Sequence, residues 1–145
     1  MSGMFAPMVN YGVGSYPYWL DSGNFNKDGK IDLVSANENS NSVSVLLGRG
    51  DYTFQASSSY GLELFLMVSQ FADLNGDGNQ DIISANTDSS TISMLLGNVD
   101  GTFRSAVSYT TGTRPFWVLG LPILTVMVVN TELHVWILQQ QFQYS

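Results

Sequence analysis

The chain has 145 residues, a length that suits one ordinary domain with a buried core. Lysine and arginine total 5 against 12 aspartate and glutamate residues, and this acidic balance argues against a nucleic-acid-binding surface and favours cations as partners. The absence of cysteine excludes disulfides, thiolate zinc sites and cysteine nucleophiles, without indicating a redox compartment.

The first repeated unit begins after an N-terminal segment, residues 1–8, that lacks a basic region followed by a clean apolar run. No signal peptide is therefore predicted there. A turn-and-aromatic segment at 14–19 precedes an acidic loop at 24–32. Two short β-branched runs, 32–36 and 42–47, then flank a polar turn at 37–41, a pattern that predicts a β-hairpin.

The same elements recur after 49 residues. The segment NKDGKIDLVSAN at 26–37 matches NGDGNQDIISAN at 75–86, since 75 − 26 = 49. Leu-Leu-Gly and Thr-Phe landmarks keep this register, and the segment 112–117 repeats 14–19 after twice that period. With further strands expected near 65–69 and 104–109, each unit has about four strands, and no segment shows helical periodicity. The period predicts an all-β, β-propeller-like fold of two four-stranded blades plus a partial third, an incomplete propeller.

We predict a single repeat domain over residues 1–145. Blade 1 covers about 13–60, blade 2 about 61–108, and a partial, anomalous third unit 109–145. Each repeat needs neighbours to bury its faces. Exposed edge blades therefore predict either a fragment of a larger propeller or self-association through those edges.

Both acidic loops carry oxygen-bearing side chains at alternate positions, and this predicts calcium sites. Ca²⁺ takes roughly six to eight oxygen ligands, and glycine at the sixth position allows the bend. The seventh residue would offer its backbone carbonyl and the ninth a carboxylate. The first loop has two formal negative charges where the second has three, so weaker binding is expected there. The predicted ligands are Asp73, Asn75, Asp77, Asn79 and Asp81 in the second loop, and Asn24, Asn26, Asp28, Lys30 and Asp32 in the first.

The two loops have two alternative interpretations. An EF-hand needs a glutamate at position twelve and flanking helices, but Ser35 and Ser84 stand there in apparent strands. Clusters of Asp-Gly and Asn-Gly also form ordinary turns, so a plain turn is the alternative to a metal site. Two copies in register favour the metal.

These motifs resemble the FG-GAP/VCBS repeat family, the calcium-binding blades of integrin-α-like β-propellers, from about residue 17 to 120. The resemblance implies Ca²⁺ bound in the loops and a non-enzymatic module for ligand recognition or adhesion. It also implies an extracellular location and an unknown protein or glycan ligand. One alternative is a carbohydrate-binding, lectin-like module, and another is a truncated or frameshifted product without independent function.

Three departures from the family pattern stand out. Asn24 replaces the first aspartate of the loop motif, and Tyr52 replaces the glycine of Asp-Gly-Thr-Phe. The third loop should start at 73 + 49 = 122, yet residues 122–130 read PILTVMVVN. A shifted reading frame is compatible there with Asp-Phe-Asn-Gly-Asp-Gly, so a frameshifted tail is a hypothesis that the nucleotide sequence tests. The apolar stretch 116–129 is too short for a membrane span, which takes roughly 20 residues.

The remaining candidates for chemistry are few. The only histidine, His134, lies in the anomalous tail, so a hydrolase triad and enzymatic activity in general are not predicted. The aromatic residues at matched positions of the first and third units are expected to fill the core between blades, with stacking on sugars as the alternative. These residues are Tyr18, Trp19, Phe116 and Trp117.

Overall fold

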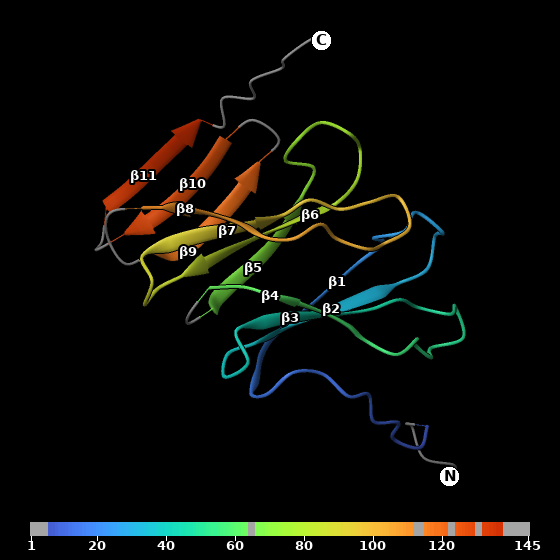
Figure 1. Ribbon diagram of the computed structural model, residues 1–145. Coiled ribbons are helices and arrows are strands. Elements are labelled where there is room, and N and C mark those ends of the chain that lie inside the picture. Colours follow the sequence, from blue (N-terminus) through green and yellow to red (C-terminus); the bar gives the residue numbers. More distant parts are fainter. Residues whose placement is uncertain (1–5, 64–65, 112–114, 122–123, 130–131, 138–145) are drawn as a thin grey trace.

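The computed structural model describes residues 6–63, 66–111, 115–121, 124–129 and 132–137. All of the regular secondary structure in these residues consists of β-strands, arranged in three antiparallel sheets (Figure 1). Within them, no helix has the length and apolar character needed to cross a membrane. The predicted all-β fold is confirmed.

The first sheet, which we call blade 1, has the strand order β1-β2-β3-β4. Polar turns join its strands, and β-branched residues fill β2 and β3 because their side chains pack well on a pleated surface. The bounds are Pro17–Gly23 for β1, Asp32–Asn37 for β2, Ser42–Leu46 for β3 and Ser58–Gly61 for β4.

The second sheet, blade 2, repeats the first strand for strand in the order β5-β6-β7-β8. Each strand starts 49 residues after its counterpart, as 66 − 17, 81 − 32, 91 − 42 and 107 − 58 show. The sequence period is therefore a period of whole four-stranded sheets, as predicted. The bounds are Leu66–Ala72 for β5, Asp81–Asn86 for β6, Thr91–Leu95 for β7 and Val107–Thr110 for β8.

The third sheet has three strands in the order β11-β10-β9 and lies beside blade 2 (Figure 1). Its strands are β9 (Pro115–Leu121), β10 (Leu124–Val129) and β11 (Glu132–Ile137). β9 keeps the register of β1, since 115 − 17 = 98, and packs against β5 and β6. β10, however, runs where the period would place an acidic loop. A strand thus stands in place of the third acidic loop, whose loss the sequence predicted. The three described sheets do not close into a ring.

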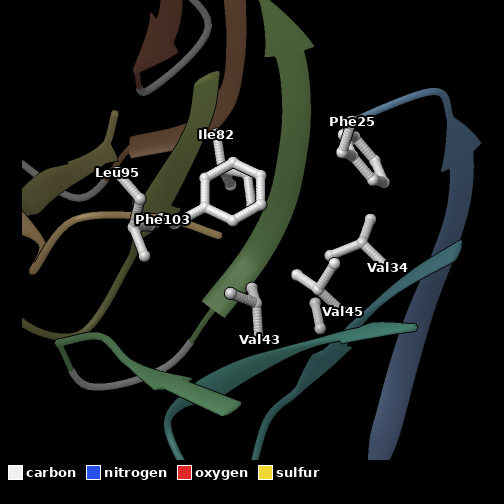
Figure 2. Packing of buried hydrophobic residues seen from close by; sticks show 8 residues of the cluster. Phe25, Val34, Val43, Val45, Ile82, Leu95 and Phe103 are labelled. Atoms are coloured by element: carbon white, nitrogen blue, oxygen red, sulfur yellow. The ribbon is translucent and has the colours of Figure 1, made fainter. Parts of the chain in front are cut away.

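The main hydrophobic core lies between blades 1 and 2. Successive side chains of a strand point to opposite faces, so alternate residues of β2 and β3 face blade 2 together. Figure 2 shows the valines of blade 1 opposite Ile82, Leu95 and Phe103 of blade 2, with Phe25 at the loop end of the cluster. A smaller cluster of Leu74, Ile83, Ala85 and Ile92 covers the other face of blade 2. The buried residues of blade 1 in the main cluster are Phe25, Val34, Ala36, Val43 and Val45.

The expectation that the matched aromatic residues fill the inter-blade core is wrong for Tyr18 and Trp19. Their exposed fractions are 58% and 36%. β1 is an edge strand of its sheet, so it has a neighbouring strand on one side only, and its pairing with β2 shifts register between Pro17 and Trp19. The side chains of Phe116 and Trp117, in β9, lie outside the described part of the structure.

Candidate metal-binding loops

Each acidic loop joins the first and second strands of its blade. Residues 24–31 connect β1 to β2, and residues 73–80 connect β5 to β6. The second residue of each loop, Phe25 or Leu74, is fully buried and anchors the loop to a core cluster. The residues that follow point outward. Because strands flank both loops, the rejection of an EF-hand is confirmed.

The two loops have the same backbone shape. Gly29 and Gly78, at the sixth position, have φ of 79° and 81°, in the left-handed region that glycine adopts without strain. Lys27 and Gly76, at the fourth position, have φ of 58° and 76°. Two left-handed residues separated by one residue turn each loop tightly. The bend predicted at the sixth position is therefore present in both copies.

The ninth residue of each loop is a buried aspartate that holds the loop closed. Both oxygens of Asp32 accept backbone N–H groups at 2.7 Å, Oδ2 from Phe25 and Oδ1 from Gly48. Asp81 repeats this pattern at 2.8 Å with Leu74 and Gly97. Each carboxylate thus ties the start of its loop to the residue just beyond the following hairpin. Carboxylate oxygens have further acceptor capacity, so this role is compatible with ligation.

The sequence predicted these aspartates only as metal ligands, and their link to the hairpin was not predicted. The sequence does contain a signal for this link, namely a constant spacing between the aspartate and a glycine. Asp32 and Gly48 are 16 residues apart, as are Asp81 and Gly97. Only glycine fits at Gly48 and Gly97, because there is no room for a side chain. A Cβ at Gly48 would collide with the carbonyl oxygen of Ile31, and one at Gly97 with that of Gln80.

The electrostatics of the second loop reflect three neighbouring carboxylates. Burial raises the pKa of Asp81 above its ordinary value, and the negative charges of Asp77 and Asp73 add to the rise. The N–H bonds from Gly97 and Leu74 act in the opposite direction. The ionised form of Asp81 is therefore held in an unfavourable environment that a nearby positive charge would improve.

Hydrogen bonds link the residues at positions one, three and five of the second loop. Asp73 accepts N–H groups from Gly76 at 2.7 Å and Gly78 at 2.8 Å. Asn75 Oδ1 accepts the Asp77 N–H at 2.9 Å, and its Nδ2 donates to Asp77 Oδ2 at 2.9 Å. The structure therefore brings Asp73, Asn75 and Asp77 together, with the carboxylates turned towards the loop's own donors.

Asp77 also lies close to residues of both loops. Its Oδ1 accepts the N–H of Asn79 at 2.7 Å. Partial burial acts to raise the pKa of Asp77, but the hydrogen bonds from Asn79 and Asn75 and the charge of Lys27 outweigh it and lower the pKa. Lys27 belongs to the first loop, so the two loops are electrostatic neighbours.

The first loop holds a positive charge of its own. Lys30 Nζ lies 3.3 Å from Asp28 Oδ2, and the Lys30 N–H donates to Asp28 Oδ1 at 2.9 Å. The backbone bond from Lys30 is the main cause of the lowered pKa of Asp28. Asn26 Oδ1 accepts the Asp28 N–H at 3.2 Å. Lys30 was predicted to contribute a carbonyl, and its ammonium group is a competitor for the same carboxylate.

One oxygen at the start of the first loop has no protein partner. Asn24 Oδ1 is buried and accepts no hydrogen bond in the described structure. Buried polar atoms are nearly always satisfied, so such an oxygen needs an explanation, and a bound cation is one that fits. Gln80 Oε1, in the second loop, is buried and unpartnered in the same way.

The donor set of the loops suits Ca²⁺. It consists of carboxylate, amide and carbonyl oxygens, which hard cations prefer. Among the described residues, no group of three or more His, Cys, Asp or Glu side chains surrounds a common point. The hydrogen bonds above explain why, since Asp32 and Asp81 are directed to amides near the hairpins and Asp73 to amides of its own loop. Ligand assignment at the ten predicted positions remains a prediction.

Comparison with known proteins identifies one repeat. A family model described as an FG-GAP-like repeat matches residues 73–123, starting at the first residue of the second loop. No curated protein and no solved structure gives a significant match. The match covers blade 2 from its loop onward together with β9, and the resemblance read from the sequence is confirmed for this segment.

Proposed function

Because residues 73–123 form an FG-GAP-like repeat, we propose that the protein is a calcium-binding, β-propeller-type module that recognises a ligand and catalyses no reaction. The supporting observation is the duplicated loop. Both copies bend at a left-handed glycine, Gly29 or Gly78, and both end in a buried aspartate, Asp32 or Asp81. A plain turn needs neither a buried carboxylate at its end nor the unpaired buried oxygen of Asn24.

The proposed role of the metal is structural. In the second loop the side chains of Asp73, Asn75, Asp77 and Asp81 and the carbonyl of Asn79 would hold Ca²⁺. The ion would neutralise carboxylates that otherwise repel one another. In the first loop the corresponding residues are Asn24, Asn26, Asp28, Lys30 and Asp32. There Lys30 already offsets the charge of Asp28, so the second loop is the stronger site.

We further propose that the module acts outside the cell in adhesion or ligand recognition, with a protein or glycan as its ligand. The family resemblance supports this location. Extracellular calcium-binding modules function with dissociation constants of about 10⁻⁴–10⁻³ M, so two loops of modest charge are adequate there.

Calcium titration followed by thermal melting and light scattering tests the proposal. A ligand that binds only the folded state raises stability by mass action, by about 2.7 kcal/mol at one hundred times its dissociation constant. Asp77→Ala should remove most of this rise, and Asp28→Ala a smaller part. Glu63→Gln, an exposed charge outside both loops, serves as the matched control and should leave the rise intact. If neither loop variant changes the response, the metal assignment is wrong.

The lectin-like alternative has one observation in its favour. Tyr18 and Trp19 are exposed beside a groove of about 400 Å³, and aromatic faces of this kind can stack on sugar rings. Glycan-array binding that Trp19→Ala abolishes would support this function. Binding to protein ligands but to no glycan would favour the adhesion module.

A further inference from the structure

Lys27 belongs to the first loop, but its charged end lies beside the second loop. Its Nζ is 3.5 Å from the point where a Cβ would stand on Gly78, the glycine at which the second loop bends. The positive charge of Lys27 contributes to the lowered pKa of Asp77, the residue before that glycine. Among the described residues Lys27 forms no ion pair as short as that between Lys30 and Asp28. Its charge therefore acts on the second loop through space and not through one fixed contact.

The packing of blade 1 on blade 2 holds Lys27 in this place. A Cβ on Gly101 of blade 2 would come within 3.1 Å of the Cβ of Asn26, the residue before Lys27. Phe25, one residue further back, packs on Phe103 of blade 2 with ring centroids 5.9 Å apart. The residues that precede Lys27 are thus fixed against blade 2, and the lysine reaches the second loop from a defined position.

The backbone at Lys27 has a conformation that glycine adopts more easily. Its φ is 58°, in the left-handed region where a Cβ is crowded by the backbone. One repeat later the same position is Gly76, with a φ of 76°. A glycine would therefore suit the turn of the first loop, and the lysine stands there at a conformational cost. Backbone strain of this kind is typical of residues with a function, and the carboxylates beside Lys27 indicate which one.

The second loop has three carboxylates and no cation of its own. They belong to Asp73, Asp77 and Asp81, whereas the first loop contains two lysines, Lys27 and Lys30. We propose that Lys27 is the counter-charge of the second loop. Its ammonium group offsets the three carboxylates while the loop holds no metal, and it moves away when Ca²⁺ enters. The second step rests on the proposed calcium function, whereas the first step does not.

A counter-charge has two effects of opposite sign. It stabilises the metal-free protein, because it lies near carboxylates that repel one another. It also weakens calcium binding, because the arriving ion meets a positive charge at close range. A lysine with a merely structural role would show the first effect without the second. Removal of the charge of Lys27 should therefore destabilise the metal-free protein and strengthen calcium binding at the second loop.

A double-mutant cycle in calcium-free buffer of low ionic strength tests the first effect. Lys27→Gln should lower the folding equilibrium constant, measured by urea denaturation, by about threefold, a value in the range of exposed charge pairs. In the Asp77→Asn background the same substitution should have a clearly smaller effect, because one of the carboxylates is gone. Lys27→Arg keeps the charge and should be close to neutral in both backgrounds. An equal effect of Lys27→Gln in the two backgrounds would overturn the proposal.

Calorimetric titration with calcium tests the second effect, in an Asp28→Ala background that disables the first loop. Lys27→Gln should bind calcium about threefold more tightly than its parent, by the same charge interaction, and Lys27→Arg about equally. Arg49→Gln removes an exposed positive charge at another place on blade 1, and this control should leave the affinity unchanged. Unchanged affinity in Lys27→Gln would show that the ammonium group does not oppose the ion. If no variant binds calcium, the proposed function and the displacement fail together, whereas the cycle still decides whether Lys27 is the counter-charge.

Discussion

Lys30 is the residue that most clearly distinguishes the first loop from the second. It stands at the position that Asn79 holds in the second loop, and its ammonium group lies 3.3 Å from Asp28. Both partners are solvent-accessible, and ion pairs of this kind contribute little to stability. The pair still places a positive charge at a proposed ligand, so an incoming cation must displace it.

Lys30→Asn therefore should strengthen calcium binding at the first loop, because it removes the competing charge and copies the residue of the second loop. Isothermal titration calorimetry in the Asp77→Ala background isolates the first loop. Lys27→Asn is the control, since Lys27 approaches the second loop instead. Equal affinity with and without Lys30 would show that its charge does not compete.

Some features of the two loops could be predicted from the sequence and others could not. The alternation of oxygen-bearing residues and the glycine bends were predictable because both depend on local backbone geometry. The isolation of Asn24 Oδ1 was not, since it depends on which donors the surrounding chain brings near. The contact between Lys27 and the second loop likewise requires the packing of two blades.

At the level of strands, each hairpin is organised around a buried asparagine. Asn86 Nδ2 donates to Thr91 Oγ1 at 3.0 Å and to Ser93 Oγ at 2.7 Å, while Ser84 donates to its Oδ1 at 3.2 Å. Asn37 makes the same contacts in blade 1 with Ser35, Ser42 and Ser44. The sequence placed Asn37 and Asn86 in polar turns. They are instead buried strand ends, because β-strand alternation directs them inward with three hydroxyl groups.

Asn86→Ala should destabilise the protein by about 2 kcal/mol, since it removes the buried amide that forms hydrogen bonds with three hydroxyl groups. Urea denaturation measures this cost, and Asn37→Ala should have a similar one. Asn39→Ala, in the exposed turn of the first hairpin, should be close to neutral. A cost for Asn86→Ala no greater than that of Asn39→Ala would mean that water replaces the lost amide.

For the whole molecule, stability depends on the contact between blades. The side chain of Phe25 projects from the loop of blade 1 and contacts Phe71 and Phe103 of blade 2, with ring-centroid distances of 4.9 and 5.9 Å. Only 1% of Phe25 is exposed. A single side chain thus connects the proposed metal loop, the core and the neighbouring sheet.

Phe25→Ala should cost about 3–5 kcal/mol, the range for a large buried aromatic side chain. Because the lost contacts lie between blades, thermal unfolding should broaden or split into two transitions. Differential scanning calorimetry distinguishes these outcomes. Leu20→Ala, at an exposed position of β1, is the control and should keep one sharp transition near the wild-type temperature.

The fold was predictable because its period is written in the sequence, and the strands of blades 1 and 2 follow it residue for residue. The exposure of Tyr18 was not predicted, because matched aromatic residues do not show which face of a blade is covered. The hydrogen bond between the Phe54 N–H and the Tyr11 hydroxyl, which repeats that between Phe103 and Tyr60, was also not predicted. It is visible only when the segment before the first recognisable loop is included in the repeat.

The bonds from Asp81 to Leu74 and Gly97 have a practical consequence. They connect the proposed calcium loop to the far end of its hairpin, so any event that separates β6 from β7 also disturbs the loop. If a luminescent lanthanide bound in this loop, its emission intensity would report on the pairing of β6 with β7. The emission would therefore change as blade 2 opens.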